Sequence, residues 1–518
     1  MRCQTVGCRK AWKKAKVNNS YCIYPKMLYI CRKFQERRIM KKNLILIGLG
    51  LLFVNLATYA QQVVKSYATD VTRTMDMTQG KAEWGTAQTG IPVINLNPAV
   101  RHQEIDGFGA AITGSTAYNL SLMSAEARHA FLQETFAPDK VGFSYVRVSI
   151  GCSDFSLSEY TLCDEPGIEH FGLTIEETKY VIPALREILA INPSLKIMGT
   201  PWTCPKWMKV KSLDEPVPYD SWTGGQLNPA CYQDYGRYFV LWIEAMQQAG
   251  VPIYCVTPQN EPLNRGNSAS LFMGWQEQLA FVKQALGPAL RKAGLDVKVY
   301  AFDHNYNYDD MADQQQYPLH IYADAEAARF FAGAAYHNYG GKADELLRIY
   351  KEAPDKELVF SEASIGTWNN GRDLEKSLLR DVEQLGLATV NGWCRGVVVW
   401  NLMLDNDRGP HRGEGACATC YGVVDIDNTD YTTITRNSHF YAMAHMSVVA
   451  KPGAYRIESS GDAGQGVIYA AFVNPDGSYG LVVSNRGDAR QVNIQIAGKP
   501  AFVANLPANG VVSYLISS

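Results

Sequence analysis

Several features that mark particular classes of protein are scarce or absent in this chain of 518 residues. Charged residues make up only 19% of it and nearly cancel, leaving a formal net charge of −2. Such a balance provides no strongly positive surface, so we expect neither nucleic acid nor an anionic membrane as a partner. There is no long low-complexity tract and no evident internal repeat. Because hydrophobic residues reach 47%, the sequence instead predicts a globular protein with a large packed core.

Signatures of metal and phosphate chemistry are missing too. No His-Glu-x-x-His sequence or cluster of His and Asp occurs, which argues against a metal-dependent hydrolase. The segment Gly107–Thr113 begins like a phosphate-binding loop, but Ile112 stands where Gly-x-Gly-x-x-Gly requires its third glycine. Cys417-Ala-Thr-Cys420 has no second ligand pair of matching spacing, so buried thiols or one local disulfide are favoured over zinc. We therefore expect no bound metal.

The sequence also lacks a hydrophobic run long enough to anchor it near its start. The apolar run Leu44–Val54 is shorter than the about 20 residues that span a bilayer. It follows Lys41-Lys42 and precedes Ala57-Thr58-Tyr59-Ala60, which is the order of a secretory signal cleaved after Ala60. No cysteine follows that site directly, so stable membrane anchoring is not expected. We predict a signal peptide at residues 40–60 and a secreted or periplasmic protein.

Residues 1–39 precede this signal and are strongly basic, with Glu36 as their single acid. We interpret them as a mis-called extension, with Met40 as the start; a cleaved or disordered basic tail is the alternative. Setting them aside leaves eight of the twelve cysteines, and export permits disulfides among these.

Between residues 105 and 401 one pattern recurs eight times: a short apolar run, a polar residue at its end, and then a helical stretch. The runs are Ile105–Thr113, Phe143–Ile150, Lys196–Thr200, Pro252–Thr257, Val297–Phe302, Gly333–Tyr336, Glu357–Phe360 and Gly396–Val399. Apolar residues at helical spacing lie between them, as in Ser124–Phe136, Ile175–Ile191, Cys231–Ala249 and Asp373–Leu387. Eight such alternations predict an α/β fold, a (β/α)₈ TIM barrel over residues 101–449, rather than an open doubly wound sheet.

The segments on either side of this region follow another pattern. Residues 450–518 alternate between apolar and polar, as in Gly466–Val473, with turn sequences at Asn474–Gly477 and Asn485–Gly487. Residues 61–100 also have the character of strands. We predict that these two segments together form a side β-sandwich.

Two glutamates stand at the ends of predicted barrel strands, where the active sites of such barrels form. Glu261 lies in Asn260-Glu261-Pro262, and Glu362 closes the run Leu358–Ser361. Retaining cleavage of a glycosidic bond needs one carboxylic acid and one carboxylate, about 5–5.5 Å apart. We predict Glu261 as the general acid/base and Glu362 as the nucleophile. The ionised Glu362 is expected to raise the pKa of Glu261.

These motifs resemble glycoside hydrolase family 30, and the resemblance covers nearly the whole chain after the signal. It is carried by Gly107–Thr113, Cys152–Ser156, Thr200–Lys209, Asn260-Glu261, His337-Asn338-Tyr339, Glu362, and Trp400-Asn401 with Gly409-Pro410. It implies a barrel with a side β-sandwich and no cofactor. The substrate-binding residues that it implies are Asp154, which binds terminal sugar hydroxyls, Trp202 in the pocket wall, Asn260, His337, Tyr339 and Trp400.

The substrate depends on the loops Leu263–Leu271, Asp303–Tyr317 and Leu402–Gly422, which are long and individual. The second loop is expected to line the leaving-group side with Asn305, Tyr306, Asn307, Tyr308 and Tyr317. Polar aromatic residues suit a second sugar better than a lipid chain. We therefore expect a monomeric enzyme that cleaves β-1,6-glucan, with a glucosylceramidase-like exo-β-glucosidase or an aryl β-glucosidase as the alternative. A catalytically silent sugar-binding protein is disfavoured because both glutamates are present.

Overall fold

The computed structural model describes residues 64–412 and 415–517, so the predicted signal peptide and the segment before it lie outside the described residues. Within the described part of the chain, no helix has both the length and the apolar character that crossing a membrane requires.

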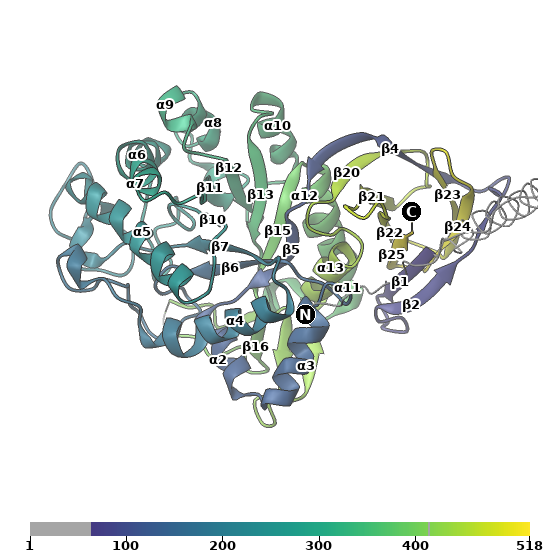
Figure 1. Ribbon diagram of the computed structural model, residues 1–518, viewed down its shortest axis with the longest axis horizontal. Coiled ribbons are helices and arrows are strands. Elements are labelled where there is room, and N and C mark those ends of the chain that lie inside the picture. Colours follow the sequence, from purple (N-terminus) through teal and green to yellow (C-terminus); the bar gives the residue numbers. More distant parts are fainter. Residues whose placement is uncertain (1–63, 413–414, 518) are drawn as a thin grey trace, which may run out of the picture. The chain divides into compact units, whose positions relative to one another are not determined.

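Eight parallel strands form the first sheet, in the order β5-β15-β13-β12-β11-β10-β7-β6. Its end strands also meet, because the amide of Ile112 donates to the carbonyl of Arg147 at 2.9 Å and that of Ser144 to the carbonyl of Phe108 at 3.0 Å. The sheet is thus a barrel (Figure 1), and the eight predicted runs are confirmed as its strands. These are β5 (Gly107–Ala111), β6 (Tyr145–Ser149), β7 (Lys196–Thr200), β10 (Cys255–Val256), β11 (Lys298–Asn305), β12 (Gly333–His337), β13 (Glu357–Glu362) and β15 (Cys394–Asn401).

Helices connect successive strands and surround the barrel in Figure 1. The four predicted helical stretches are all helical, although two of them include a π-helical segment, η2 and η8. The helices are α2 (Gly114–Leu122), α3 (Ala125–Phe136), η2 (Glu176–Val181), α4 (Ile182–Ile191), α5 (Tyr232–Gln248), α6 (Trp275–Phe281), η5 (Val282–Leu286), α7 (Gly287–Lys292), α8 (Tyr317–Tyr322), α9 (Ala325–Ala328), α10 (Asp344–Glu352), α11 (Leu374–Asp381), η8 (Val382–Leu387), α12 (Ala388–Asn391) and α13 (Ser438–Ser447).

The loops of the barrel carry shorter elements. Paired short strands are β8 (Lys209–Val210) with β9 (Gln226–Leu227), β14 (Ile365–Gly366) with β17 (Cys420–Tyr421), and β16 (Met403–Asp405) with β18 (Val424–Ile426) and β19 (Ile434–Arg436). Single 3₁₀ turns are η1 (Ile168–His170), η3 (Lys206–Met208), η4 (Pro229–Cys231), η6 (Tyr308–Asp310) and η7 (Thr367–Asn369).

Side chains fill the barrel interior, and ion pairs lie at the amino ends of its strands. Tyr145, Met198, Cys255, Tyr300, Ala335, Val359 and Val398 form one buried apolar cluster, to which most of the barrel strands contribute one residue each. At the amino ends of the strands, buried Asp106 pairs with Lys196 at 2.6 Å and with Arg395 at 3.1 Å. In β5, a Cβ at Gly109 would come within 2.1 Å of the carbonyl oxygen of Tyr145, so only glycine lets β5 approach β6 this closely.

The second sheet combines strands from both ends of the described chain. Its order is β2-β1-β25-β22-β21-β20-β4-β23-β24-β3, and in Figure 1 the purple strands lie among the yellow ones. β1 pairs antiparallel with β25, and β4 pairs antiparallel with β20 and parallel with β23, so the predicted joint sandwich is confirmed. The strands are β1 (Val64–Asp70), β2 (Thr78–Ala82), β3 (Trp84–Gly85), β4 (Val93–Glu104), β20 (Tyr455–Ser460), β21 (Val467–Val473), β22 (Tyr479–Asn485), β23 (Arg490–Ile496), β24 (Ala501–Leu506) and β25 (Gly510–Ile516).

Helix α13 joins this sandwich to the barrel. All ten of its residues are buried, and His445 within it contacts two sandwich strands. The Nδ1 atom of His445 lies 2.9 Å from the hydroxyl of Ser513 on β25, and Nε2 lies 2.9 Å from that of Thr69 on β1. Burial lowers the pKa of His445 to about 3, so the imidazole is neutral in the folded protein.

Candidate active site

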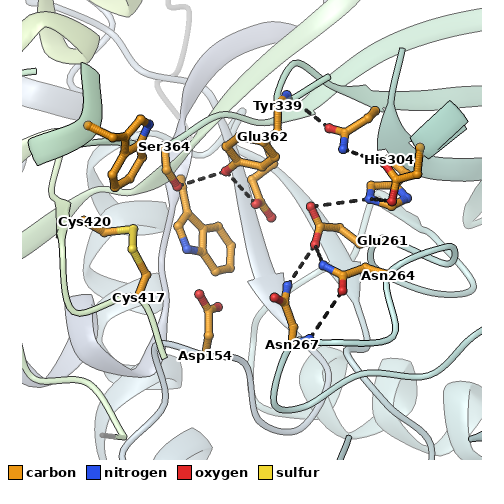
Figure 2. Close-up of a pocket in the computed structure, with 14 residues that line it drawn as sticks. Asp154, Glu261, Asn264, Asn267, His304, Tyr339, Glu362, Ser364, Cys417 and Cys420 are labelled. Atoms are coloured by element: carbon orange, nitrogen blue, oxygen red, sulfur yellow. Dashed lines mark hydrogen bonds and ion pairs between the residues drawn. A yellow bond between two sulfur atoms is a disulfide. The ribbon is translucent and has the colours of Figure 1, made fainter. Parts of the chain in front are cut away.

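A cavity of about 310 Å³ lies at the carboxyl ends of the barrel strands (Figure 2). Its wall combines carboxylates, amides, an imidazole and indole rings, which is the mixture that a sugar pocket requires. The lining residues are Asp154, Glu261, Asn264, Asn267, His304, Asn305, Asp309, Tyr339, Glu362, Ser364, Trp368, Trp400, Cys417 and Cys420.

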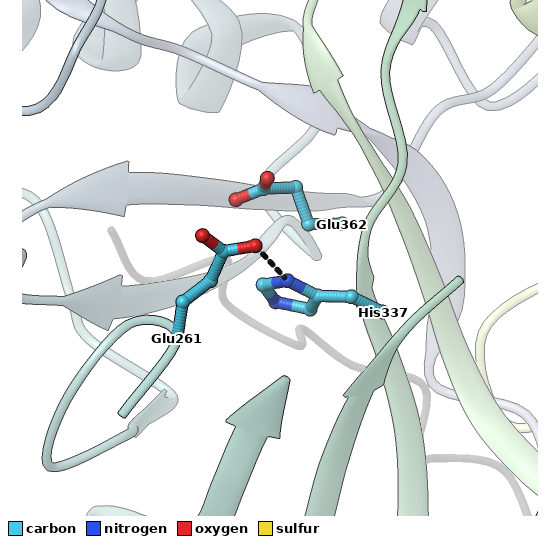
Figure 3. A group of neighbouring side chains, drawn as sticks. All are labelled: Glu261, His337 and Glu362. Atoms are coloured by element: carbon cyan, nitrogen blue, oxygen red, sulfur yellow. Dashed lines mark ion pairs between the residues drawn. The ribbon is translucent and has the colours of Figure 1, made fainter. Parts of the chain in front are cut away.

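Two glutamates face each other in this cavity (Figure 3). Glu362 is the last residue of β13, and Glu261 lies in the loop after β10 with a positive φ of 44°. One carboxylate oxygen of each, together with one ring nitrogen of His337, lie within 4.8 Å of one another. Both glutamates are buried, with 7% and 6% of their surface exposed. Two carboxyl groups this close, from different strands, can act on the two ends of one bond.

Glu362 is held by two donors. Nη1 of Arg147 donates to Oε2 at 2.5 Å, and the hydroxyl of Tyr339 donates to Oε1 at 2.8 Å. Arg147 is fully buried on β6, and its Nη2 also donates to Asn260 at 2.7 Å and to Asp303 at 2.9 Å. A guanidinium in this position fixes the orientation of the carboxylate and favours its charged form.

Asp303 on β11 binds several of the groups that surround the two glutamates. Its carboxylate accepts from Arg147 and Thr257, and Nε2 of His337 lies 3.0 Å from Oδ1. Burial opposes its charge, but Arg147 and His337 hold the pKa of Asp303 well below its usual range. The backbone of Asp303 has a φ of 80°, a conformation that costs a non-glycine residue energy and is often found at functional sites.

Glu261 has a different set of neighbours. Asn264 and Asn267 donate to its Oε2 at 2.8 and 2.9 Å, while Nδ1 of His337 and Nε2 of His304 lie 3.5 and 3.7 Å from its Oε1. Burial raises the pKa of Glu261, but His304 and His337 outweigh this and lower the pKa to about 2. The expected upward shift is therefore wrong for the free site, because the sequence did not reveal that both imidazoles face Glu261.

The pKa values of His337 and Glu362 are also shifted by their charged neighbours. The carboxylates of Glu362 and Asp303 overcome burial and raise the pKa of His337 to about 9. Burial, together with the charge of Glu261, raises the pKa of Glu362 against the opposing effects of His337 and Arg147.

Among the described residues, Glu261, His337 and Glu362 are the one group of three side chains with the spacing of metal ligands. The guanidinium of Arg147, 2.5 Å from Glu362, would repel a cation there. The donor set therefore suits an ion-paired carboxylate rather than a metal.

Residues 105–449 match the description "Glycosyl hydrolase family 30 TIM-barrel domain", and residues 453–514 match "Glycosyl hydrolase family 30 beta sandwich domain". The chain belongs to glycosyl hydrolase family 30.

Relatives of this family 30 chain have two kinds of activity in their names. Endo-1,6-beta-D-glucanase BGN16.3 of Trichoderma harzianum is 31% identical over 463 residues, which cover 85% of this chain and 89% of the relative. Lysosomal acid glucosylceramidase of Mus musculus is 27% identical over 443 residues, covering 80% and 81%. The solved structure of the endo-beta1,6-glucanase BT3312 is 57% identical, with a TM-score of 0.85 and coverage of 88% and 100%. The family 30 chain is a β-glycoside hydrolase.

The predicted site residues of the hydrolase fall into two layers. Glu261, Glu362, Asp154, Tyr339 and Trp400 line the cavity. Burial and the charge of Glu362 raise the pKa of Asp154 to about 7.

Three other predicted residues lie behind this lining. His337 and Asn260 are buried, and the ring of Trp202 stacks on that of Trp400 with centroids 5.1 Å apart. The guanidinium carbon of Arg147 lies 4.9 Å from the Trp202 ring, so Trp202 supports Trp400 and Arg147 from behind instead of lining the cavity.

The predicted stacking residues of the leaving-group side are largely wrong. Tyr306, Tyr308 and Tyr317 are at most 4% exposed, because they pack on Phe302, Tyr336 and Phe360 in the main hydrophobic core. Asn305 does line the cavity, whereas Asn307 does not. The polar-aromatic composition of this loop indicated a sugar-binding surface, but Tyr308 and Tyr317 pack on Phe302 of the preceding strand β11, and Tyr306 packs on Tyr336 and Phe360 of β12 and β13.

Several residues of the site were not predicted. Arg147 carried a usable signal, since a charged residue in the middle of an apolar strand needs a buried partner. Asn264, Asn267 and Trp368 carried none, because they lie in loops whose course the sequence alone did not define.

Proposed function

We propose that this β-glycoside hydrolase cleaves β-1,6-linked glucan with retention of configuration. The observation that carries the retaining mechanism is the pair Glu261 and Glu362, whose nearest carboxylate oxygens lie within 4.8 Å. Retaining enzymes place their carboxyl groups about 5–5.5 Å apart, whereas inverting enzymes leave about 6.5–9.5 Å for a water molecule.

In the first step Glu362 attacks the anomeric carbon while Glu261 gives a proton to the glycosidic oxygen. The bond to the leaving sugar breaks, and a covalent glycosyl–enzyme forms. In the second step Glu261 takes a proton from water, the hydroxide oxygen bonds to the anomeric carbon, and Glu362 departs as a carboxylate. Arg147 and Tyr339 keep Glu362 ionised and oriented through both steps.

Glu261 obtains its proton from the pair that it forms with His337. In the free site the pair holds one proton on the imidazole, because the pKa of His337 is raised to about 9 and that of Glu261 is lowered. Nδ1 of His337 lies 3.5 Å from Oε1 of Glu261, so the proton has a short path to the carboxylate. A sugar that fills the cavity displaces water from both groups and favours the neutral pair.

The substrate assignment rests on the relatives and on the chemistry of the walls. We assign one glucose ring to the part of the cavity lined by Asp154, which can bind hydroxyls, and Trp400, whose indole can stack on a sugar. The leaving-group side holds Asn264, Asn267, His304 and Asp309, polar groups suited to a second sugar and unsuited to two lipid chains. A 1,6-link adds one rotatable carbon, which lets the second ring reach a side wall of the cavity.

Hydrolysis of a panel of glycosides tests this proposal. We expect β-1,6-glucan to be cleaved at least about tenfold more efficiently than β-1,3- or β-1,4-glucan, which corresponds to about 1.4 kcal/mol of transition-state discrimination. Retention is read from the β-anomer of the first product by NMR. If β-1,6-glucan is untouched while glucosylceramide or an aryl glucoside is cleaved well, the exo-β-glucosidase alternative replaces it. The 27% identity to the mouse glucosylceramidase favours that alternative.

We further propose that the enzyme is exported through a signal peptide at residues 40–60 and acts as a monomer. Edman sequencing of the exported protein should begin at Gln61, the residue after the predicted cleavage site. Light scattering should give the mass of a single chain.

A further inference from the structure

One edge of the catalytic cavity is formed by a disulfide. Cys417 and Cys420 are bonded to each other and line the same cavity as Glu261 and Glu362. Figure 2 draws the bridge on one side of the cavity, with Asn264 and Asn267 on the other. Sulfur atoms in this position can contact a bound sugar directly.

The disulfide loop is joined to the segment that follows the proposed nucleophile. Strand β17 pairs with β14, so Cys420 lies opposite Gly366 and Tyr421 opposite Ile365. The amide of Thr367 donates to the carbonyl of Thr419 at 3.0 Å, and a Cβ at Gly366 would come within 2.4 Å of the same carbonyl oxygen. The two backbones therefore fit closely, and the position of one fixes the position of the other.

The segment held in this way carries two residues that face the substrate. Trp368, in the turn η7, lines the cavity with 51% of its surface exposed, an unusual exposure for an indole. Ser364 has its hydroxyl 2.9 Å from the Tyr339 oxygen, and Tyr339 in turn donates to Glu362. The disulfide loop thus supports an aromatic surface at the cavity mouth and, through Ser364, a contact of the nucleophile.

We propose that the Cys417–Cys420 disulfide determines substrate specificity by positioning Trp368 as a stacking surface for a glucan sugar bound at the mouth of the cavity. This inference rests on the proposed function. The disulfide joins residues that are only three apart in sequence, so it restricts little of the unfolded chain. Its main effect is on the local conformation of the loop. A dithiol reductant supplies two electrons and two protons: the S–S bond breaks, two thiols form, and the reductant closes to a cyclic disulfide.

The other cysteines of the described chain allow this effect to be isolated. Cys152, Cys163, Cys204, Cys255 and Cys394 are buried free thiols, and Cys231 is a partly exposed free thiol. None of the six lines the cavity. A reversible effect of a dithiol on the folded enzyme can therefore be assigned to the disulfide, and Cys231→Ser serves as the matched control.

The test is steady-state kinetics of the full enzyme and of Cys417→Ser/Cys420→Ser. Loss of one aromatic stacking contact predicts a KM for β-1,6-glucan about tenfold higher, with kcat within about twofold of wild type. An aryl glucoside, whose leaving group is a single small ring, should show a smaller change in KM. Dithiol treatment should reproduce the change in wild type and in Cys231→Ser and leave the double variant unaffected.

Trp368→Ala separates positioning from a general effect on folding. It should raise KM to the same extent, and combining it with the double serine variant should add nothing further, because both remove one contact. An unchanged KM, additive effects, or a parallel loss of kcat and thermal stability would overturn the inference. Failure of wild type to cleave β-1,6-glucan would overturn the proposed function instead, and the variants are then compared on the glycoside that wild type cleaves best.

Discussion

At the scale of single residues, the two glutamates should respond differently to substitution. Glu362→Gln is expected to lower turnover of every substrate by about 10³-fold or more, because no nucleophile remains. Glu261→Gln should spare substrates with activated leaving groups, which need little protonation. Azide should rescue Glu261→Ala and yield a β-glycosyl azide, which mass spectrometry detects. Equal losses on both substrate types, without rescue, would count against Glu261 as the acid.

The pH dependence of kcat/KM follows from the same pair. Because the pKa of Glu362 is raised, the nucleophile becomes protonated at a higher pH than an ordinary glutamate would. Activity should therefore fall as the pH drops through the pKa of Glu362. The raised pKa of His337, about 9, means that the shared proton is lost as pH rises towards that value. A bell-shaped profile between these limits is expected, with the alkaline limb shifted to lower pH in His337→Asn. A rate that stays flat from about pH 4 to 9 would reject this assignment.

Which of these residues the sequence revealed depended on their position in a strand or loop. Glu261 and Glu362 were predictable because Glu362 ends a recognisable apolar strand and Glu261 closely follows another, and the parallel barrel brings all such ends to one mouth. Trp202 was predicted in the wall and lies one layer behind it, because its ring packs on Trp400. The position of Trp368 in the cavity could not be predicted, because it depends on the pairing of β14 with β17, two short strands that are far apart in sequence.

At the scale of elements, helix α13 provides a test of how the barrel and sandwich stay joined. The hydroxyl of Ser513 donates to the carbonyl of His445, so Nδ1 of His445 must donate to that hydroxyl and Nε2 must accept from Thr69. His445→Leu leaves two buried hydroxyls without this partner and should lower the free energy of unfolding by about 1–3 kcal/mol at pH 7.5. Urea denaturation measures this directly.

The same variant should also be less sensitive to acid. The folded pKa of His445, about 3, lies below the unfolded value, so the unfolded chain binds a proton first as pH falls below about 6.5. Between pH 6.5 and 5 wild type should lose about 2 kcal/mol through this group, and His445→Leu should not. An identical loss in both proteins would show that other groups, such as His439, dominate acid unfolding.

The barrel's elements were predictable for a physical reason. Strands buried on both faces read as continuous apolar runs, and the amphipathic helices between them keep a 3.6-residue period. The π-helical segments η2 and η8 were not predictable, since one extra residue per turn barely changes that pattern.

At the scale of the whole molecule, strands from both ends of the described chain form one sheet, so we expect the barrel to fold only together with the sandwich. Deleting residues 453–517 would remove β25 from beside β1, would remove both partners of β4, and would uncover part of the buried helix α13. We expect the shortened chain to aggregate on expression, whereas a separate barrel would stay soluble and retain a cooperative thermal transition. Size-exclusion chromatography and circular dichroism distinguish these outcomes.

The pairing of β1 with β25 also sets a time order for biosynthesis. Val64 lies opposite Ile516, so the first described strand waits for nearly the whole chain before its partner exists. At about 5–20 residues per second a ribosome needs roughly 20–90 s to make the intervening chain. During that interval the sandwich sheet is incomplete, because β25 is not yet present beside β1. The chain therefore cannot finish folding before its last strand is made. A chain that is still incompletely folded can pass through a translocation pore, which suits a protein proposed to leave the cytoplasm.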